Sequence, residues 1–157
     1  MQKFKRIMSL VLVITLLTTA FTIQNAVRTQ AKTFKQTGGY STSLSTKKDK
    51  SEQYYSYAKK LVFKGNKFTL YGSMHYTKSG DVYSSKIYKR AKRTYIIASN
   101  CKYIKMNYNN GKMTRKKITK KKLKKLALPL DKGKFSNRTL AWKIQGGKVV
   151  ELEYRDY

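Results

Sequence analysis

The chain has 157 residues, of which 36 are Lys or Arg and seven are Asp or Glu, so its net charge is +29. This length suits one ordinary domain with a hydrophobic core, and the charge favours polyanionic partners without specifying a fold. With one Cys and one His, the chain excludes an intrachain disulfide and a structural zinc set.

Residues 1–31 carry the three regions of a secretory signal peptide. A basic start precedes the uncharged run 7–23, and Thr29 with Ala31 forms a small-x-small site. We therefore expect cleavage after Ala31, with Ala20 and Ala26 as weaker alternatives. The alternative is an uncleaved membrane anchor, because the run approaches the roughly 20 residues that span a bilayer. Cleavage would leave 32 Lys and Arg against seven acids, a net charge of +25, on an exported chain with no stable membrane span.

Residues 32–58 are rich in Ser, Thr, Lys, Gly and Tyr and lack apolar periodicity. This composition predicts a flexible basic arm. Asp49 and Glu52 form a pair like a capping box, so a short helix after them is an alternative, although "KKLVF" favours a strand there. The folded domain is expected to occupy residues 59–157.

The segment from about Lys59 to Tyr108 has the composition of β-strands. "KLVFKGNKFTLYGSMHY" predicts two strands joined by a turn at Gly65-Asn66, or else one long bent strand. "RTYIIASNCKYIKMNY" predicts two further strands, and "NNG" at 109–111 predicts the turn that ends them. The stretch "VYSSKIYKRAK" between these runs is ambiguous.

The most basic stretch, "TRKKITKKKLKKL" at 114–126, holds eight cations and no acid. Thr119 is a good N-cap and Pro129 prevents much continuation, so a helix is predicted over 120–127. The apolar side chains fall within one half of the helical wheel, which indicates a stripe that faces the core and a cationic back in solvent. The members of this stripe are Ile118, Leu123, Leu126 and Ala127.

The C-terminal segment "LAWKIQGGKVVELEY" gives the clearest pattern, because apolar residues alternate on both sides of a glycine turn. It predicts a hairpin with Leu140, Trp142 and Ile144 on one strand and Val150, Leu152 and Tyr154 on the other. The order of the elements predicts an all-β fold with one short helix. We expect a small antiparallel, partly open barrel, either OB-like or another half-open type.

The leader and the terminal "WKIQGGKVVELEY" resemble those of small exported proteins of Gram-positive bacteria that lack a characterised activity. The resemblance implies an extracytoplasmic location, either secreted or associated with the cell wall. It implies no catalytic residue.

Catalytic groups are few in this sequence, and we expect neither an enzyme nor a cofactor. Glu151 and Glu153 lie two apart on one strand, a spacing that a glycan or wall hydrolase could use. The simpler interpretation is an exposed pair on the last strand that binds neighbouring lysines and keeps that edge of the sheet soluble. Cys101 is expected to be a small buried side chain, and a catalytic triad that includes His75 is not excluded.

Tyrosines alternate with cations along the β region, as they do in proteins that bind single-stranded nucleic acids or sugars. Tyr is also a favoured strand residue, so its abundance alone requires no ligand. The residues predicted to bind polyanions lie in the basic stretch and in a loop expected at 83–93. They are Arg115, Lys116, Lys117, Lys120, Lys121, Lys124, Lys89, Arg90, Lys92, Arg93, Tyr83 and Tyr88.

These features favour an exported, cationic, non-enzymatic protein that associates with anionic polymers of the cell wall or surface. Extracellular nucleic acid and acidic glycans are further candidate partners. Two other functions remain open: a secreted cationic toxin or antimicrobial protein, and a small hydrolase that uses Glu151 and Glu153.

Overall fold

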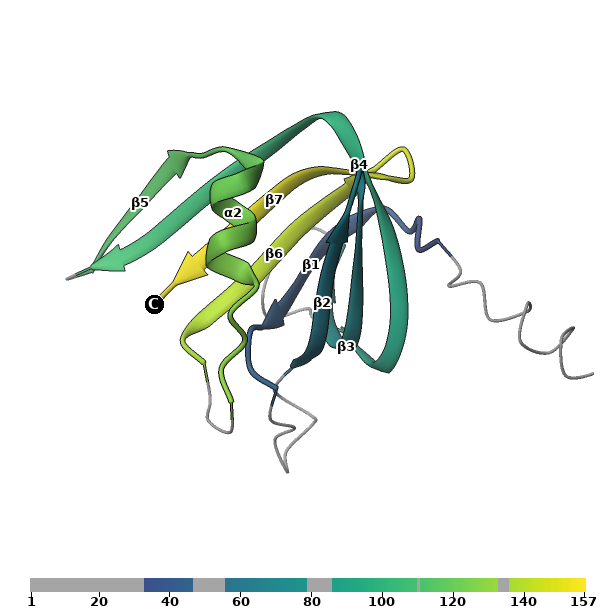
Figure 1. Ribbon diagram of the computed structural model, residues 1–157, viewed down its shortest axis with the longest axis horizontal. Helices are drawn as coiled ribbons and strands as arrows, with labels where there is room; N and C mark the ends of the chain where they lie inside the picture. The colour runs from purple at the N-terminus through teal and green to yellow at the C-terminus, as the bar shows by residue number, and fades with distance from the viewer. Residues whose placement is uncertain (1–32, 47–55, 79–85, 110, 133–135) are drawn as a thin grey trace, which may run out of the picture. The chain divides into compact units, whose positions relative to one another are not determined.

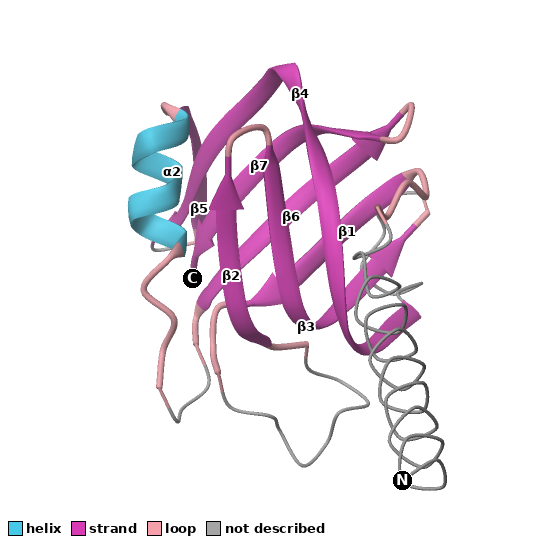
Figure 2. Ribbon diagram, turned by 45° about the vertical axis from the view of Figure 1, so that its right-hand side comes forward, coloured by secondary structure: helices cyan, strands magenta, loops and turns pink. Residues whose placement is uncertain are grey.

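Seven strands and one helix make up the part of the chain that the computed structural model describes, residues 33–46, 56–78, 86–109, 111–132 and 136–157. The predicted leader lies outside these residues. Figures 1 and 2 show the elements. In chain order they are β1 (Gly38–Ser43), β2 (Ala58–Lys64), β3 (Lys67–Thr77), β4 (Lys86–Asn109), β5 (Lys112–Lys117), α2 (Lys120–Ala127), β6 (Arg138–Gln145) and β7 (Lys148–Asp156).

Five of the strands pair in a ring. The pairs run from β3 to β1, β6, β7 and β4, and β4 pairs with β3 to complete the ring. β2 and β5 extend the sheet from β3 and β4, so the sheet is ring-like rather than a regular barrel (Figure 2). The predicted class, mostly β with one short helix, is confirmed. The order agrees with an OB-like arrangement if β1 and β2 together count as the first strand.

The prediction of an antiparallel sheet is wrong at one pair, because β4 and β7 run parallel. The chain between them passes through β5, α2 and β6, which is long enough for the crossover that parallel neighbours require. The terminal hairpin itself is antiparallel as predicted, with Gly146 and Gly147 in the turn and φ angles of 55° and 73°. The sheet is therefore mixed.

The prediction of a flexible arm over 32–58 is wrong for Gly38–Ser43, which forms β1 in the ring. Small residues and Tyr40 alternate between buried and half-buried positions there, and pairing with β3 and β6 satisfies the backbone. Further upstream, the backbone N–H of Phe34 donates to the carbonyl of Thr94 at 2.9 Å. The compact unit begins at Thr33, well before the expected boundary at residue 59.

β2 and β3 form the predicted hairpin at Gly65-Asn66 rather than one long bent strand, and no helix forms over Ala58–Lys64. The two strands predicted around residues 93–108 are in fact a single strand of 24 residues, β4. Its first half pairs with β3 and its second half with β7 and β5. The pairing of β4 with β7 shifts between Ile97 and Lys102. β5 was not predicted, because its six residues are all exposed and include only one apolar side chain, Met113.

Aromatic rings dominate the core inside the ring. Phe68 and Tyr95 stack with their centroids 4.6 Å apart, and Trp142 meets both rings edge-on or nearly so. Tyr40 stacks on Trp142 at 5.7 Å, which ties β1 to β6. Each such pair stabilises the fold by about 0.5–1.5 kcal/mol beyond the effect of burying apolar area. The tyrosines of the core therefore have a structural role.

Gly72 lies in β3 opposite Ala58, at the start of β2, and the backbones approach so closely there that a glycine is required. A Cβ at this position would lie 2.1 Å from the backbone oxygen of Tyr57, which cannot turn away as a side chain can. We expect Gly72→Ala to lower the free energy of unfolding by about 2 kcal/mol, measured by urea denaturation. Gly39→Ala is the matched control, because its Cβ meets the rotatable hydroxyl of Thr77 at 3.0 Å. Equal losses in the two variants would contradict this role of Gly72.

In the described residues, α2 is the one helix, and neither its length nor its hydropathy suits a membrane crossing.

Candidate anion-binding surface

The helix α2 forms where the sequence predicts it and is anchored as predicted. The Thr119 hydroxyl accepts a hydrogen bond from the Lys122 backbone N–H at 3.2 Å, which caps the first turn. Leu123 and Ala127 are fully buried in the core, and Ile118 and Leu126 pack against it partly buried. The lysines are therefore left on the solvent side of the helix.

The first turn of α2 carries three lysines and no acid. Cations at a helix N-terminus oppose the macrodipole, typically at about 0.3–1 kcal/mol each, so this arrangement reduces helix stability. Lys120 is partly compensated, because its Nζ donates to the carbonyl of Gly65 at 2.8 Å. Lys121 and Lys122 are exposed, and Lys124 is half-buried in the second turn. The positive end of the helix is thus a region of concentrated positive charge.

Arg115, Lys116 and Lys117 lie in β5 and not in a segment leading into the helix. Alternation along the strand places Arg115 and Lys117 on one face and Lys116 on the other. The structure therefore divides the predicted basic stretch between two elements, a strand and a helix, so its cations do not share one face.

The predicted binding loop at 83–93 is wrong from residue 86 onward, because this segment begins β4 and pairs with β3. Tyr83 lies outside the described residues, and Lys89, Arg90 and Lys92 are exposed. Arg93 and Tyr88 are engaged within the domain. The Arg93 guanidinium donates to the carbonyls of Lys89 at 2.7 Å and Gly72 at 3.2 Å and lies 5.6 Å from the Tyr88 ring centroid. The Tyr88 hydroxyl donates to Gln36 at 2.7 Å.

The sequence did not single out Tyr71, which lies in a row of three residues across β2, β3 and β4. Lys60 and Lys92 are its two cross-strand partners, and their Nζ atoms lie 5.9 Å and 5.5 Å from the centroid of the Tyr71 ring. This row combines an aromatic face with two cations. It was missed because partners in a row are distant in the chain.

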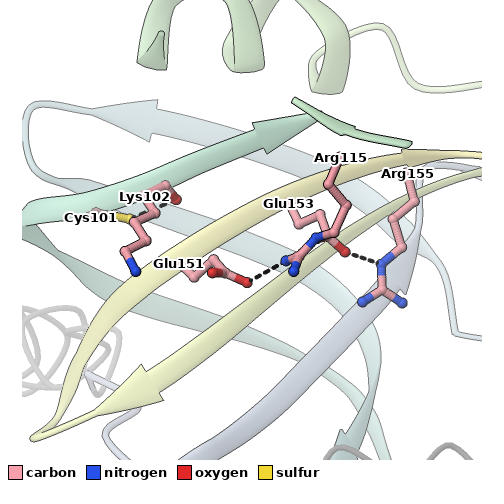
Figure 3. Close-up of polar contacts among 6 residues, drawn as sticks. All are labelled: Cys101, Lys102, Arg115, Glu151, Glu153 and Arg155. Atoms are coloured by element: carbon pink, nitrogen blue, oxygen red, sulfur yellow. Dashed lines mark hydrogen bonds and ion pairs between the residues drawn. The ribbon is translucent and has the colours of Figure 1, made fainter. Parts of the chain in front are cut away.

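Glu151 and Glu153 belong to an ion-pair network on the outer face of β7 (Figure 3). Arg115 Nη2 contacts Glu153 Oε2 at 2.6 Å and Glu151 Oε1 at 3.1 Å. Arg155 Nε contacts the other Glu153 oxygen at 2.6 Å. Glu153 is only 3% exposed, and both of its oxygens are bonded to arginines. The two carboxylates therefore face arginines rather than open solvent.

The predicted surroundings of the two glutamates are wrong in three respects, of which the first is that Glu153 is buried rather than exposed. β7 is not an edge strand, because it lies between β6 and β4, and the partners of its carboxylates are arginines rather than lysines. Arg115 reaches Glu153 from β5, across β4. The signal in the sequence was the residue type: Arg is the usual choice for a fixed, bidentate carboxylate partner, whereas Lys is the usual surface cation.

The remaining described carboxylates are also bonded. Asp131 accepts from Arg138 and from the Ser136 hydroxyl, which hold the pKa of its carboxyl below the usual value. Asp156 accepts from the Tyr154 hydroxyl at 3.3 Å. All ion pairs among the described residues are made by arginines, so their lysines have no carboxylate as counter-ion.

No protein family, curated protein or solved structure matches this chain. The surface must therefore be interpreted from its own chemistry.

Cys101 and His75 are the one thiol and the one imidazole of the chain. Cys101 is buried as expected, and burial raises the pKa of its thiol to about 11, so it is almost entirely protonated at neutral pH. His75 lies in β3 and is half-buried. The described residues contain no group of three His, Cys, Asp or Glu side chains that could hold a metal ion.

Proposed function

We propose that this protein is an exported, non-enzymatic binding protein that associates with anionic polymers of the cell wall or surface. Its lysines attract the polymer through a broad positive field, and the solvent side of α2 contributes the highest local charge. Binding of this kind weakens steeply with salt and has little dependence on polymer sequence.

The observation that supports this proposal is the pairing of charges. The described residues include 27 Lys and Arg but only four acids, and each acid is bonded within the domain. The remaining cations therefore have no carboxylate partner within the described part of the chain. An external polyanion would neutralise it and would release counter-ions on binding.

The first turn of α2 gives a second reason. Lys120, Lys121 and Lys122 lie at the positive end of the helix, where cations are locally unfavourable. A bound anion would reverse this effect, because it interacts favourably with both the lysines and the helix terminus. A local cost to folding of this type is common where a surface serves binding.

The test is retention on immobilised poly(glycerol phosphate) as salt is increased. The variant Lys121→Gln/Lys122→Gln/Lys125→Gln removes three exposed cations from α2. We expect the slope of log affinity against log salt to fall by about two, because each lost contact contributes about 0.7. The charge-matched control is Lys132→Gln/Lys143→Gln/Lys148→Gln, also exposed but outside α2, and it should lose less.

Equal losses in both triple variants would contradict a special role of α2 and leave only the diffuse field. A wild-type protein that elutes without any dependence on salt would contradict the proposed function itself. Export is tested separately, by dividing native cells into medium, wall and membrane fractions and washing the wall with salt.

A toxin or antimicrobial function is the second candidate, because the same positive field attracts anionic lipids. It predicts leakage of anionic vesicles at about micromolar protein, whereas the binding proposal predicts adsorption without leakage. The helix is eight residues long and uses its apolar face in the core, which favours the binding proposal.

A further inference from the structure

The outer face of β4 and β5 contains a surface pocket of about 230 Å³. Its lining residues are Lys102, Ile104, Arg115 and Lys117. Ile104 and Lys117 are cross-strand partners, and β5 ends at Lys117, so no β5 residue pairs with Lys102. The pocket therefore lies near the end of β5, from which the chain continues to α2.

Three of the four lining residues are cations. Lys102 and Lys117 are exposed and belong to the lysines that have no carboxylate counter-ion among the described residues. Arg115 differs, because Glu151 and Glu153 fix its guanidinium (Figure 3). The register places Lys117 between Lys102 and Arg115 along the strands. The fixed guanidinium is preorganised, since less side-chain freedom is lost when an anion binds.

We propose that this pocket binds one phosphate group of a polyol phosphodiester chain. The inference rests on the proposed function and specifies the chemistry of its ligand. Nε and Nη2 of Arg115 both donate to Glu153 Oε2, and Nη2 also donates to Glu151 Oε1, so the edge of the guanidinium that suits a carboxylate is already occupied. Lys102 and Lys117 contribute two ammonium groups, and Arg115 contributes Nη1, which bonds to neither glutamate. Lysine ammonium groups bind phosphate as point charges, so this set of donors suits a phosphate group.

The volume of the pocket and its apolar lining residue limit which chemical group can bind next to the phosphate. Ligand pockets for whole small molecules typically measure about 300–1,000 Å³, so 230 Å³ suits one phosphate with an adjoining polyol unit. Ile104 is the apolar lining residue and offers a surface for the carbon atoms of that unit. The pocket is thus a subsite for one repeat of a polymer that the broad positive field holds near the domain.

The test is a titration of the isotopically labelled protein, followed by amide chemical shifts, with inorganic phosphate and with a short glycerol phosphodiester oligomer in separate arms. We expect saturable shifts at Lys102, Ile104 and Lys117 in the oligomer arm, and weaker binding of inorganic phosphate at the same amides. Lys102→Gln/Lys117→Gln should weaken oligomer binding about tenfold. Lys105→Gln/Lys116→Gln is the control, because this cross-strand pair removes the same charge from the opposite face of the same strands.

Two results would contradict a phosphate site in this pocket. One is a set of chemical shift changes spread evenly over α2 and the pocket, and the other is an equal loss of oligomer affinity in both double variants. Equal affinity for inorganic phosphate and the oligomer would identify free phosphate as the ligand and overturn the role of the polyol unit. Retention on the polymer column reports the proposed function independently: a wild-type protein that is retained but shows no localised shifts would contradict the pocket alone.

Discussion

Glu153→Gln should lower the free energy of unfolding by about 3 kcal/mol, although the change replaces one atom and keeps the shape of the side chain. Glu153 is 3% exposed and is the shared partner of Arg115 and Arg155. Removing its charge leaves two guanidinium groups close together with only Glu151 to balance them. We place the effect at the lower end for broken buried pairs, because both arginines are partly exposed and can turn towards water.

The measurement is urea denaturation at neutral pH with Glu151→Gln as the matched control. Glu151 is more exposed and contacts Arg115 through one oxygen, so its loss should cost no more than about 0.5 kcal/mol. Equal destabilisation in the two variants would contradict the central position of Glu153. The control also addresses the hydrolase alternative, which requires that Glu151→Gln abolish any turnover of wall or glycan polymers, whereas a binding protein has no such turnover to lose.

Leu123→Ala should lower the free energy of unfolding by about 3 kcal/mol, because Leu123 is the larger of the two fully buried side chains of α2. The helix contacts β4 and β7, and its eight residues are too few to remain helical without that packing. We therefore expect the midpoint temperature of thermal unfolding to fall, measured by calorimetry or circular dichroism.

Leu128→Ala is the matched control, since Leu128 lies just after the helix and is 42% exposed. Its loss should change stability by less than about 0.5 kcal/mol. If Leu123→Ala were equally mild, α2 would not depend on the core for its position, and its lysines would not be held on a fixed surface.

The elements that sequence analysis predicted correctly are those whose signals are local. Thr119 and Pro129 limit α2 because capping and the effect of Pro act within one or two turns of a helix. Gly65-Asn66 and Gly146-Gly147 mark two hairpins because a turn and its flanking strands are adjacent in the chain. The strand composition of these segments was sufficient to predict the fold class.

The errors concern partners that are distant in the chain. "GGYSTS" has the composition of a linker because it lacks an apolar run. It nevertheless forms strand β1, because it pairs with β3 on one side and with β6 on the other. The spacing of Glu151 and Glu153 shows that they share a face, but it cannot show that Arg115 reaches them across β4. The candidate surface was therefore predicted by composition, whereas its division among β4, β5 and α2 required the structure.

The two ends of the sheet have a consequence for how copies of this protein meet. β2 and β5 are the terminal strands of the described sheet, and unpaired strand edges commonly join edge to edge. Here the edges are lined with cations, including Lys59 and Lys64 on β2 and Lys112 and Lys116 on β5. Two such edges repel each other, so the charge that we propose to attract a polyanion would also oppose edge-to-edge association. A crowded layer of this protein on a polymer would remain a layer of separate domains.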